Sequence, residues 1–413
     1  MSSTEGNALA IEETKEELGG IERRVARPRT EPELRALFAR LGKAQQHGIL
    51  IGRGSSMDWC APTLWCDPPS TDETLWISME SLIAPGSTGI VEYVPGDGTL
   101  TAQGGAPIET LRAAVLEGGH RITPAGPSRG ATLGGMLASG ASSLDRCAFG
   151  PTRHHVLGMR IQDATDRGPT KTGGRLVKNA TGFDLHRLHV GGRGTLGAIL
   201  EASLRLVPVP EAEVLVVSRP YSSAAEATAA ALQIRSKRGI QPRALFVVHG
   251  KLHVVLAGRE RQMETEHKRL LADLDVESEV RGLEVEPLAL EAARRRSVIT
   301  IGTAPSRVED IARQLESNGI GPLYVEPDAA LVELDQEALG HAPGEFLQGL
   351  DPRLVHVTLH RPIPKLRALQ NAIQEVATPA PALRQWTERL RSSFDPQGVL
   401  SSPDFPLPTD TSR

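Results

Sequence analysis

Two patterns of apolar positions alternate along the first half of the chain and predict different elements. Apolar or alternating runs at 25–28, 48–51, 75–79, 90–94, 99–103, 156–161 and 200–206 predict strands. Helical spacing predicts one helix up to Gly42, with Thr30 and Glu33 spaced as a capping box, and a second from Pro107 to Gly118. The first half therefore predicts a mixture of strands and helices.

The pattern changes after Pro208-Val209-Pro210, which predicts a domain boundary. The residues beyond it predict two strand–helix–strand–strand units, and hence an antiparallel sheet with helices on one face. A strand at 354–360 and two amphipathic helices, at 366–376 and 383–394, complete the chain. We predict an α+β fold with a flexible tail at 1–20, a first domain at 21–208, a second at 209–360 and C-terminal helices at 361–413 that pack back on the first domain.

Composition excludes several classes of function. The 413 residues carry a net charge of -4, have only 3% aromatics and show no basic stripe, which disfavours nucleic-acid binding. No apolar run approaches the ~20 residues of a membrane helix, and the N-terminus has no signal-peptide pattern. Three cysteines without a Cys-x-x-Cys pair disfavour disulfide, zinc and iron–sulfur frameworks. These features predict a cytoplasmic protein.

Three glycine-rich segments are candidates for ligand contact. Residues 52–58 follow a strand and combine glycines with serines, as in loops whose backbone N–H groups bind phosphate. Small residues at 128–140 begin a helix and leave room for a flat ligand against the backbone. Residues 191–197 contain four glycines before the strand at 200–206. A tight turn or close helix packing explains each segment taken alone.

The same segments carry a resemblance to a known family. Residues 178–185, KNATGFDL, resemble the "KN-x-x-GYDL" element of FAD-linked oxidases of the vanillyl-alcohol oxidase (PCMH) superfamily. Residues 194–208 resemble its "GTLG-x-x-x-E-x-x-L" element, ATLGG at 131–135 matches its flavin-lining helix, and 149–158 resemble "YG-x-x-RD-x-VLG". The chain is most similar to the FAD-binding subunits of glycolate oxidase complexes.

The resemblance implies a two-part PCMH-type FAD-binding domain, an antiparallel-sheet cap domain and a set of cofactor contacts. It implies non-covalent FAD, since Ser55 stands where covalent members place a flavin-linking histidine. The implied FAD-binding residues are Gly52, Arg53, Gly54, Ser55, Ser56, Gly130, Thr132, Leu133, Gly134, Gly135, Ser139, Gly140, Gly150, Lys178, Asn179, Gly194 and Ile199.

The strand at 354–360 carries the one candidate catalytic residue, His356. A metal shared by His356 and His360 is rejected, because four residues of strand separate them by about 13 Å, too far for ligand bonds near ~2 Å. No metal site is predicted. His356 resembles the histidine of the family's "GGHATL" strand, and a hydrogen-bonded structural histidine explains it equally well.

The resemblance implies oxidation of a 2-hydroxy acid, glycolate or D-lactate, with electrons passing through FAD to a partner or a quinone. Arg129, Arg153 or Lys178 is the candidate partner of the substrate carboxylate. The implied partners are a larger paralogous flavin subunit and an Fe–S subunit, with contact to the inner membrane only through them.

Departures from the family pattern support an alternative. Phe149 and Phe183 replace tyrosines, and the ending FDPQGVL at 394–400 lacks the basic residue that usually follows it. The alternative is an FAD-holding assembly or electron-relay subunit without activity of its own, and a third hypothesis is a binding module without FAD.

Overall fold

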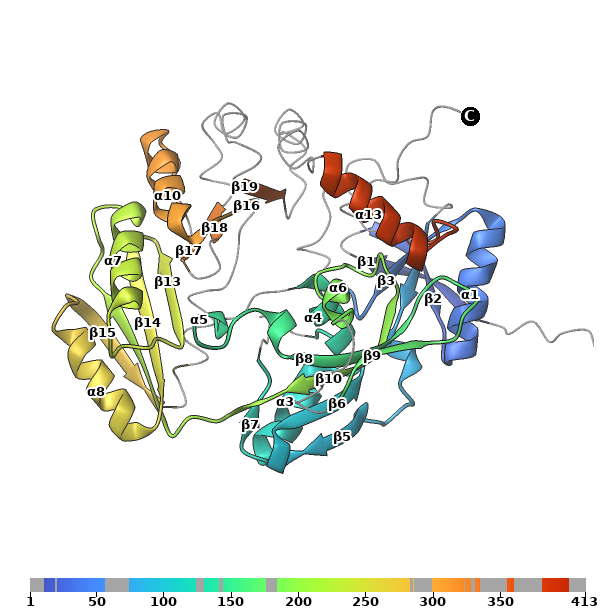
Figure 1. Ribbon diagram of the computed structural model, residues 1–413, viewed down its shortest axis with the longest axis horizontal. Helices are drawn as coiled ribbons and strands as arrows, with labels where there is room; N and C mark the ends of the chain where they lie inside the picture. The colour runs from blue at the N-terminus through green and yellow to red at the C-terminus, as the bar shows by residue number, and fades with distance from the viewer. Residues whose placement is uncertain are drawn as a thin grey trace, which may run out of the picture.

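The computed structural model describes residues 11–18, 21–55, 74–123, 130–140, 144–175, 184–282, 285, 299–322, 324–327, 331–334, 355–359 and 381–400. These residues form three main sheets with helices packed against them (Figure 1), which confirms the α+β prediction. Two of the sheets belong to the first half of the sequence, and the third is built from its second half.

The first sheet has four strands in the order β1-β2-β4-β3. Helix α1 (Glu31–Ala44) begins as predicted, because the Thr30 side chain accepts a hydrogen bond from the Glu33 N–H at 3.3 Å. The strands are β1 (Glu12–Leu18), β2 (Ile21–Arg27), β3 (His47–Ile51) and β4 (Thr74–Ser78).

Strand β1 lies where the sequence predicted a flexible tail, and that prediction is wrong for residues 12–18. The segment is acidic and resembles a solvated tail in composition, but it pairs along its whole length with β2. Glu16 forms an ion pair with Arg27 at 2.7 Å and Glu13 with Arg24 at 3.0 Å. Opposite charges on neighbouring strands thus support a ladder that hydrophobic periodicity does not predict.

The second sheet is antiparallel, with the order β5-β6-β10-β8-β9. Helices α3 (Ile108–Glu117) and α4 (Leu133–Ser139) share its core. Its strands are β5 (Ile90–Val94), β6 (Thr99–Gln103), β8 (Val156–Gln162), β9 (Thr170–Gly173) and β10 (Ala198–Arg205). Shorter elements are η1 (Glu80–Leu82), η2 (Pro95–Asp97), β7 (His120–Arg121), α5 (Arg146–Phe149), η3 (Thr152–His154), α6 (His186–His189) and β11 (Val207–Pro208).

The central strand β10 differs from its predicted one-sided pattern. A register shift between Ile199 and Glu201 exchanges its two faces, so Ile199 packs in the same core as Leu204, while Leu200 packs against the first sheet. Ser203, predicted to face solvent, is only 5% exposed and hydrogen-bonds Thr101 at 2.9 Å. The strand is therefore buried on both sides.

The third sheet has eight strands, all antiparallel, in the order β15-β12-β14-β13-β17-β18-β16-β19. Its strands are β12 (Ala212–Ser218), β13 (Ala244–Val248), β14 (Lys251–Gly258), β15 (Val276–Arg281), β16 (Ile299–Thr303), β17 (Tyr324–Glu326), β18 (Leu331–Leu334) and β19 (Val355–Leu359). The sequence analysis missed β15, whose residues VESEVR are mostly charged.

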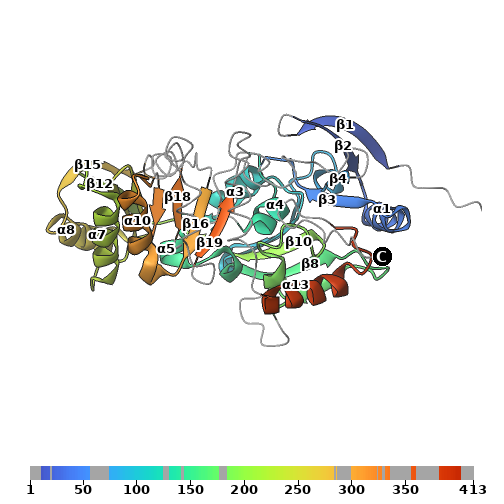
Figure 2. The same ribbon diagram turned by 90° about the horizontal axis from the view of Figure 1, so that it is seen from above.

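Three helices cover one face of this sheet, as predicted. They are α7 (Ala224–Ser236), α8 (Glu260–Leu271) and α10 (Val308–Ser317), the last preceded by η5 (Pro305–Arg307). All three contribute to one hydrophobic core with the strands. Figures 1 and 2 show these helices on the side of the sheet that faces away from α4 and β10.

The opposite face of the eight-stranded sheet carries a smaller core cluster. Phe246 on this face stacks on His253 and on Tyr324, with ring centroids 4.9 and 5.8 Å apart. Val285 belongs to this cluster, and Leu144, from the segment just before α5, packs against it. The short helix α5 contacts β13, and this face of the sheet is turned toward the first half of the chain (Figure 1).

A buried ion-pair chain links the two halves. Arg243, at the start of β13 and 6% exposed, pairs with Asp145 at the N-terminus of α5 and with Glu213 of β12. Glu213 also pairs with Arg121 of β7 at 2.7 Å. The four residues come from four separate segments.

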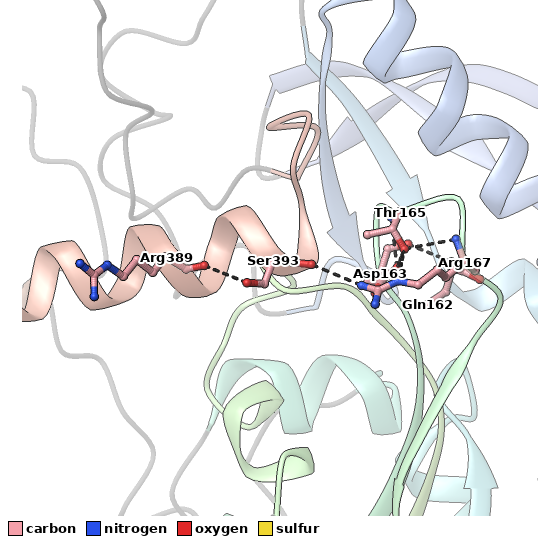
Figure 3. A network of polar contacts seen from close by, with 6 residues as sticks. All are labelled: Gln162, Asp163, Thr165, Arg167, Arg389 and Ser393. Atoms are coloured by element: carbon pink, nitrogen blue, oxygen red, sulfur yellow. Dashed lines mark hydrogen bonds and ion pairs between the residues drawn. The ribbon is translucent and has the colours of Figure 1, made fainter.

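The C-terminal segment returns to the first two sheets. Helix α13 (Pro381–Phe394) ends beside the β8–β9 connection, where Arg167 donates to the Ser393 carbonyl at 3.4 Å (Figure 3). Phe394 packs edge-on against His189 of α6. Asp395 then accepts from the N–H groups of residues 399 and 400, which lie next to β3.

The predicted apolar stripe of α13 is only partly buried, since Trp386 is 62% and Leu390 37% exposed. The other predicted C-terminal helix, 366–376, lies outside the described residues.

Candidate functional site

The loop after β3 presents unused backbone donors. In the described part of the chain, the N–H groups of residues 52–55 donate to no protein acceptor. The Gly52 carbonyl is held by the Ser78 hydroxyl at 3.1 Å, and the Arg53 guanidinium pairs with Glu80 at 2.7 Å. Gly54 has a φ of 75°, whereas the residues on either side of it have negative φ. Such a change in the sign of φ lets successive N–H groups converge on an anion.

The start of α4 lies directly against this loop. A Cβ on Gly52 would stand 2.2 Å from the Thr132 hydroxyl oxygen, and a Cβ on Gly130 would stand 3.9 Å from the Ser55 Cβ. Thr132 caps α4 by accepting from the Gly135 N–H at 3.2 Å. Two of the three predicted glycine-rich segments are therefore neighbours.

The N–H groups at the start of α4 are already used by the protein. Leu133 donates to the Ala106 carbonyl at 2.8 Å and Gly134 to the Gly104 carbonyl at 2.6 Å. These two N–H groups are therefore not available to an anion. Gly134 packs on the Gly104 backbone, where a Cβ would stand 2.9 Å from the carbonyl oxygen. A Cβ on Gly135 would stand 3.1 Å from the Thr132 hydroxyl oxygen and 4.0 Å from the Gly52 nitrogen, so this glycine faces the loop after β3.

The third segment closes on the end of the same helix. The Gly191 and Arg193 N–H groups donate to the carbonyls of residues 137 and 138, each at 2.9 Å. Gly140 has a φ of 64°, and a Cβ there would stand 2.8 Å from the Gly191 Cα. Gly194 packs on Leu50 of β3 in the same way, at 3.1 Å. All three segments thus meet around α4 and the end of β3.

Other predicted contact residues lie elsewhere or are not described. Gly150 ends α5 beside His154, and Ile199 is 6% exposed in the core under α4. Ser139 donates to the Met136 carbonyl at 2.9 Å. Ser56, Lys178 and Asn179 lie outside the described residues, as do the alternative carboxylate partners Arg129 and Lys178.

The backbone of His356 is placed, and its side chain is outside the description. Residue 356 pairs with Gly302, which pairs with Leu331, which pairs with Glu326. This register puts position 356 in the same cross-strand row as Glu326, which is 4% exposed. Within the described residues, no group of three or more His, Cys, Asp or Glu side chains is arranged to hold a metal ion.

Several histidines beside the three segments are buried and neutral. His155 is fully buried between Phe149 and Thr123, and burial lowers its pKa. Burial lowers the pKa of His189 to about 4, against a smaller opposing effect of Asp163. These rings act as packing and hydrogen-bonding groups at neutral pH rather than as cations.

Sequence reasoning missed two features of this region. Gly104 lies beneath α4 and accepts from the Gly134 N–H, while Gly105 packs against the backbone of Met79 and Glu80, and their doublet was a readable signal. The ion pair of Arg243 with Asp145 had no such signal, because 98 positions separate the two residues.

Residues 23–167 match FAD_binding_4, the FAD-binding domain family. The chain carries an FAD-binding domain. FAD is therefore its cofactor, and the N–H donors of residues 52–55 fit the pyrophosphate of a dinucleotide.

Curated relatives match over part of their length. The chain is 39% identical over 126 residues to "Glycolate oxidase subunit GlcE" of Escherichia coli (strain K12), covering 30% of this chain and 36% of that protein. It is 34% identical over 149 residues to "D-2-hydroxyglutarate dehydrogenase" of Xanthomonas citri pv. viticola, covering 35% of this chain and 30% of that protein. The chain thus matches about a third of the length of these relatives.

Solved structures show the same fold over nearly the whole chain. An alkyldihydroxyacetonephosphate synthase structure aligns with a TM-score of 0.59 at 14% identity, covering 94% of this chain and 78% of that one. This likeness shows the fold alone. Among the described helices, none combines the length and the apolar character needed to cross a membrane.

Proposed function

We propose that this protein is an FAD-dependent oxidoreductase that converts a 2-hydroxy acid to the 2-oxo acid, as a subunit of a glycolate oxidase-like complex. The observation that carries the proposal is the convergence of residues 52–55, 130–140 and 191–194 around α4. Relatives named for glycolate, D-lactate and D-2-hydroxyglutarate support the substrate class.

The chain's own residues have separate tasks in this proposal. The N–H groups of residues 52–55 bind the pyrophosphate, and Gly135, which faces this loop, adds no side chain there. Bound FAD supplies the two-electron acceptor. The sheet face that carries Phe246 covers the site and excludes water. His356 takes the proton of the substrate hydroxyl.

A second candidate is an FAD-holding subunit that relays electrons without oxidising a substrate itself. Phe149 replaces a tyrosine of the family pattern and so lacks a hydroxyl that could bind a substrate, which favours this candidate. We therefore keep this candidate alongside the first.

Anaerobic spectroscopy distinguishes the candidates. The purified chain should show visible flavin absorbance, and acid precipitation should release the flavin if attachment is non-covalent. Bleaching on addition of glycolate, D-lactate or D-2-hydroxyglutarate supports the oxidoreductase, and His356→Gln should slow it without loss of flavin. Flavin that stays oxidised with all three acids, but is reduced when a larger flavin subunit co-purifies, supports the relay subunit.

A further inference from the structure

An open surface cavity lies on the outer side of the eight-stranded sheet, away from the glycine-rich segments. Its volume is about 560 Å³, and it is lined by the loop residues Gly239 and Gln241 and by one side of α8. The α8 residues in the lining include 262, 265, 266 and 269, which share one face of the helix. Figure 1 shows α8 at the far edge of the molecule from α4.

Three arginines line this cavity without carboxylate partners. Arg259, Arg261 and Arg269 form no ion pair in the described part of the chain, and Arg269 instead donates to the Gly239 carbonyl at 3.1 Å. Elsewhere the chain pairs its arginines extensively, as with Arg281 and Arg313 in the same half. The three residues are exposed, so their guanidinium groups are open to an anion from solvent.

The cavity's only carboxylate lining residue does not neutralise this charge. Glu266 is 8% exposed, and its two oxygens accept from the Gln241 N–H at 3.0 Å and from the Gln262 amide at 2.8 Å. Both oxygens are therefore occupied by neutral donors. The lining keeps three positive groups against one negative group.

We propose that this cavity binds a small molecule bearing two or more oxyanion groups, either a di- or tricarboxylate or a phosphate ester. Arginine forks match carboxylate and phosphate oxygens with paired hydrogen bonds. The volume lies within the ~300–1,000 Å³ range of small-molecule sites and exceeds the need of a lone ion. The site is independent of the FAD site and of the proposed reaction.

Calorimetric titration of the full chain tests the proposal. Citrate and inorganic phosphate are the probes, each at constant ionic strength set with NaCl, because salt screens exposed charges over about 8 Å at 0.15 M. Saturable binding of either probe supports the site, and the stronger of the two identifies the carboxylate or the phosphate class. If neither citrate nor phosphate gives a larger heat of titration than NaCl does, the proposal is overturned.

Charge variants locate the binding. Arg261→Gln and Arg259→Gln should each weaken the bound probe about tenfold, the scale of one lost charge-assisted contact. Lys268→Gln is the matched control, since it removes the same charge from exposed α8 without lining the cavity. An equal loss in Lys268→Gln, or none in either arginine variant, overturns the proposal. Unchanged thermal unfolding of all three variants verifies their folding.

Discussion

Gly52→Ala tests the contact between the loop after β3 and the start of α4. The added Cβ would lie 2.2 Å from the Thr132 hydroxyl oxygen and 3.1 Å from both its Cβ and Cγ2. Gly52 has no left-handed φ, so the clash is the only source of strain. Because Thr132 caps α4, moving it costs about 1 kcal/mol for the cap and about 1–3 kcal/mol for overpacking.

We expect Gly52→Ala to lose about 2–4 kcal/mol of unfolding free energy and to release FAD more readily. Urea unfolding of the flavin-free protein measures the first effect, and equilibrium dialysis followed by flavin absorbance measures the second. Gly96→Ala is the control, since a Cβ there meets no atom within 4 Å and the residue has an ordinary φ.

The double variant Gly52→Ala/Thr132→Ala makes the reasoning refutable. Removing the Thr132 hydroxyl and methyl leaves only its Cβ at 3.1 Å, so the double variant should be less destabilised than the sum of the single variants. Strict additivity, or full FAD retention and stability in Gly52→Ala, would contradict the proposed packing of the loop on α4.

Three further predictions concern stability. Burial lowers the folded pKa of His189 and of His253 to about 4, below the unfolded value near ~6.5. The contribution of each histidine to stability is therefore complete above pH ~6.5 and falls by up to about 3 kcal/mol as the pH drops toward 4. Urea unfolding at several pH values should show this loss, and His253→Phe should show a smaller dependence of the unfolding free energy on pH. Arg243→Met should cost about 3–5 kcal/mol by leaving buried carboxylates unpaired, whereas Arg219→Met, at an exposed pair, should cost less than about 1 kcal/mol in the same assay. Ser223→Ala should cost about 1 kcal/mol by removing the cap of α7, and no change in the unfolding midpoint would contradict that role.

Elements with strong local signals were predictable from the sequence. The cap of α1 at Thr30, the turn between β5 and β6, and the helices α3 and α7 all lie where periodicity and capping residues placed them. The antiparallel arrangement of the eight-stranded sheet followed from its repeated strand–helix–strand–strand order. In each case the determining residues are close together in the sequence.

The failures occur where distant residues decide the structure. Strand β1 depends on arginines of β2, and the bulge in β10 depends on how this strand pairs with its two neighbours β6 and β8. The donors at the start of α4 are used by carbonyls of residues 104 and 106, which no local pattern announces. Glycine density indicated the three segments of the site but not which protein backbone each glycine meets.

The glycines of the site first serve the protein's own packing. Gly134, Gly140 and Gly197 each bring backbone within 3 Å of where a Cβ would stand. A glycine-rich stretch is thus weak evidence for a cofactor at any single position, since close packing explains it as well. The N–H groups of residues 52–55 are different, because no acceptor among the described residues pairs with them.

Directional ion pairs, more than shared apolar surface, set how the two halves of the chain meet. The main hydrophobic clusters stay within one half each, with small contributions from Leu144 and Cys147 across the junction. Arg243 instead joins Asp145 of one half to Glu213 of the other. Ion pairs of this kind depend steeply on geometry, so they fix an orientation that a smooth apolar contact would leave adjustable. If the sheet face that carries Phe246 covers the proposed substrate site, Arg243→Met should reduce turnover more than it reduces FAD content. Equal losses of turnover and FAD content would place the role of Arg243 in overall folding.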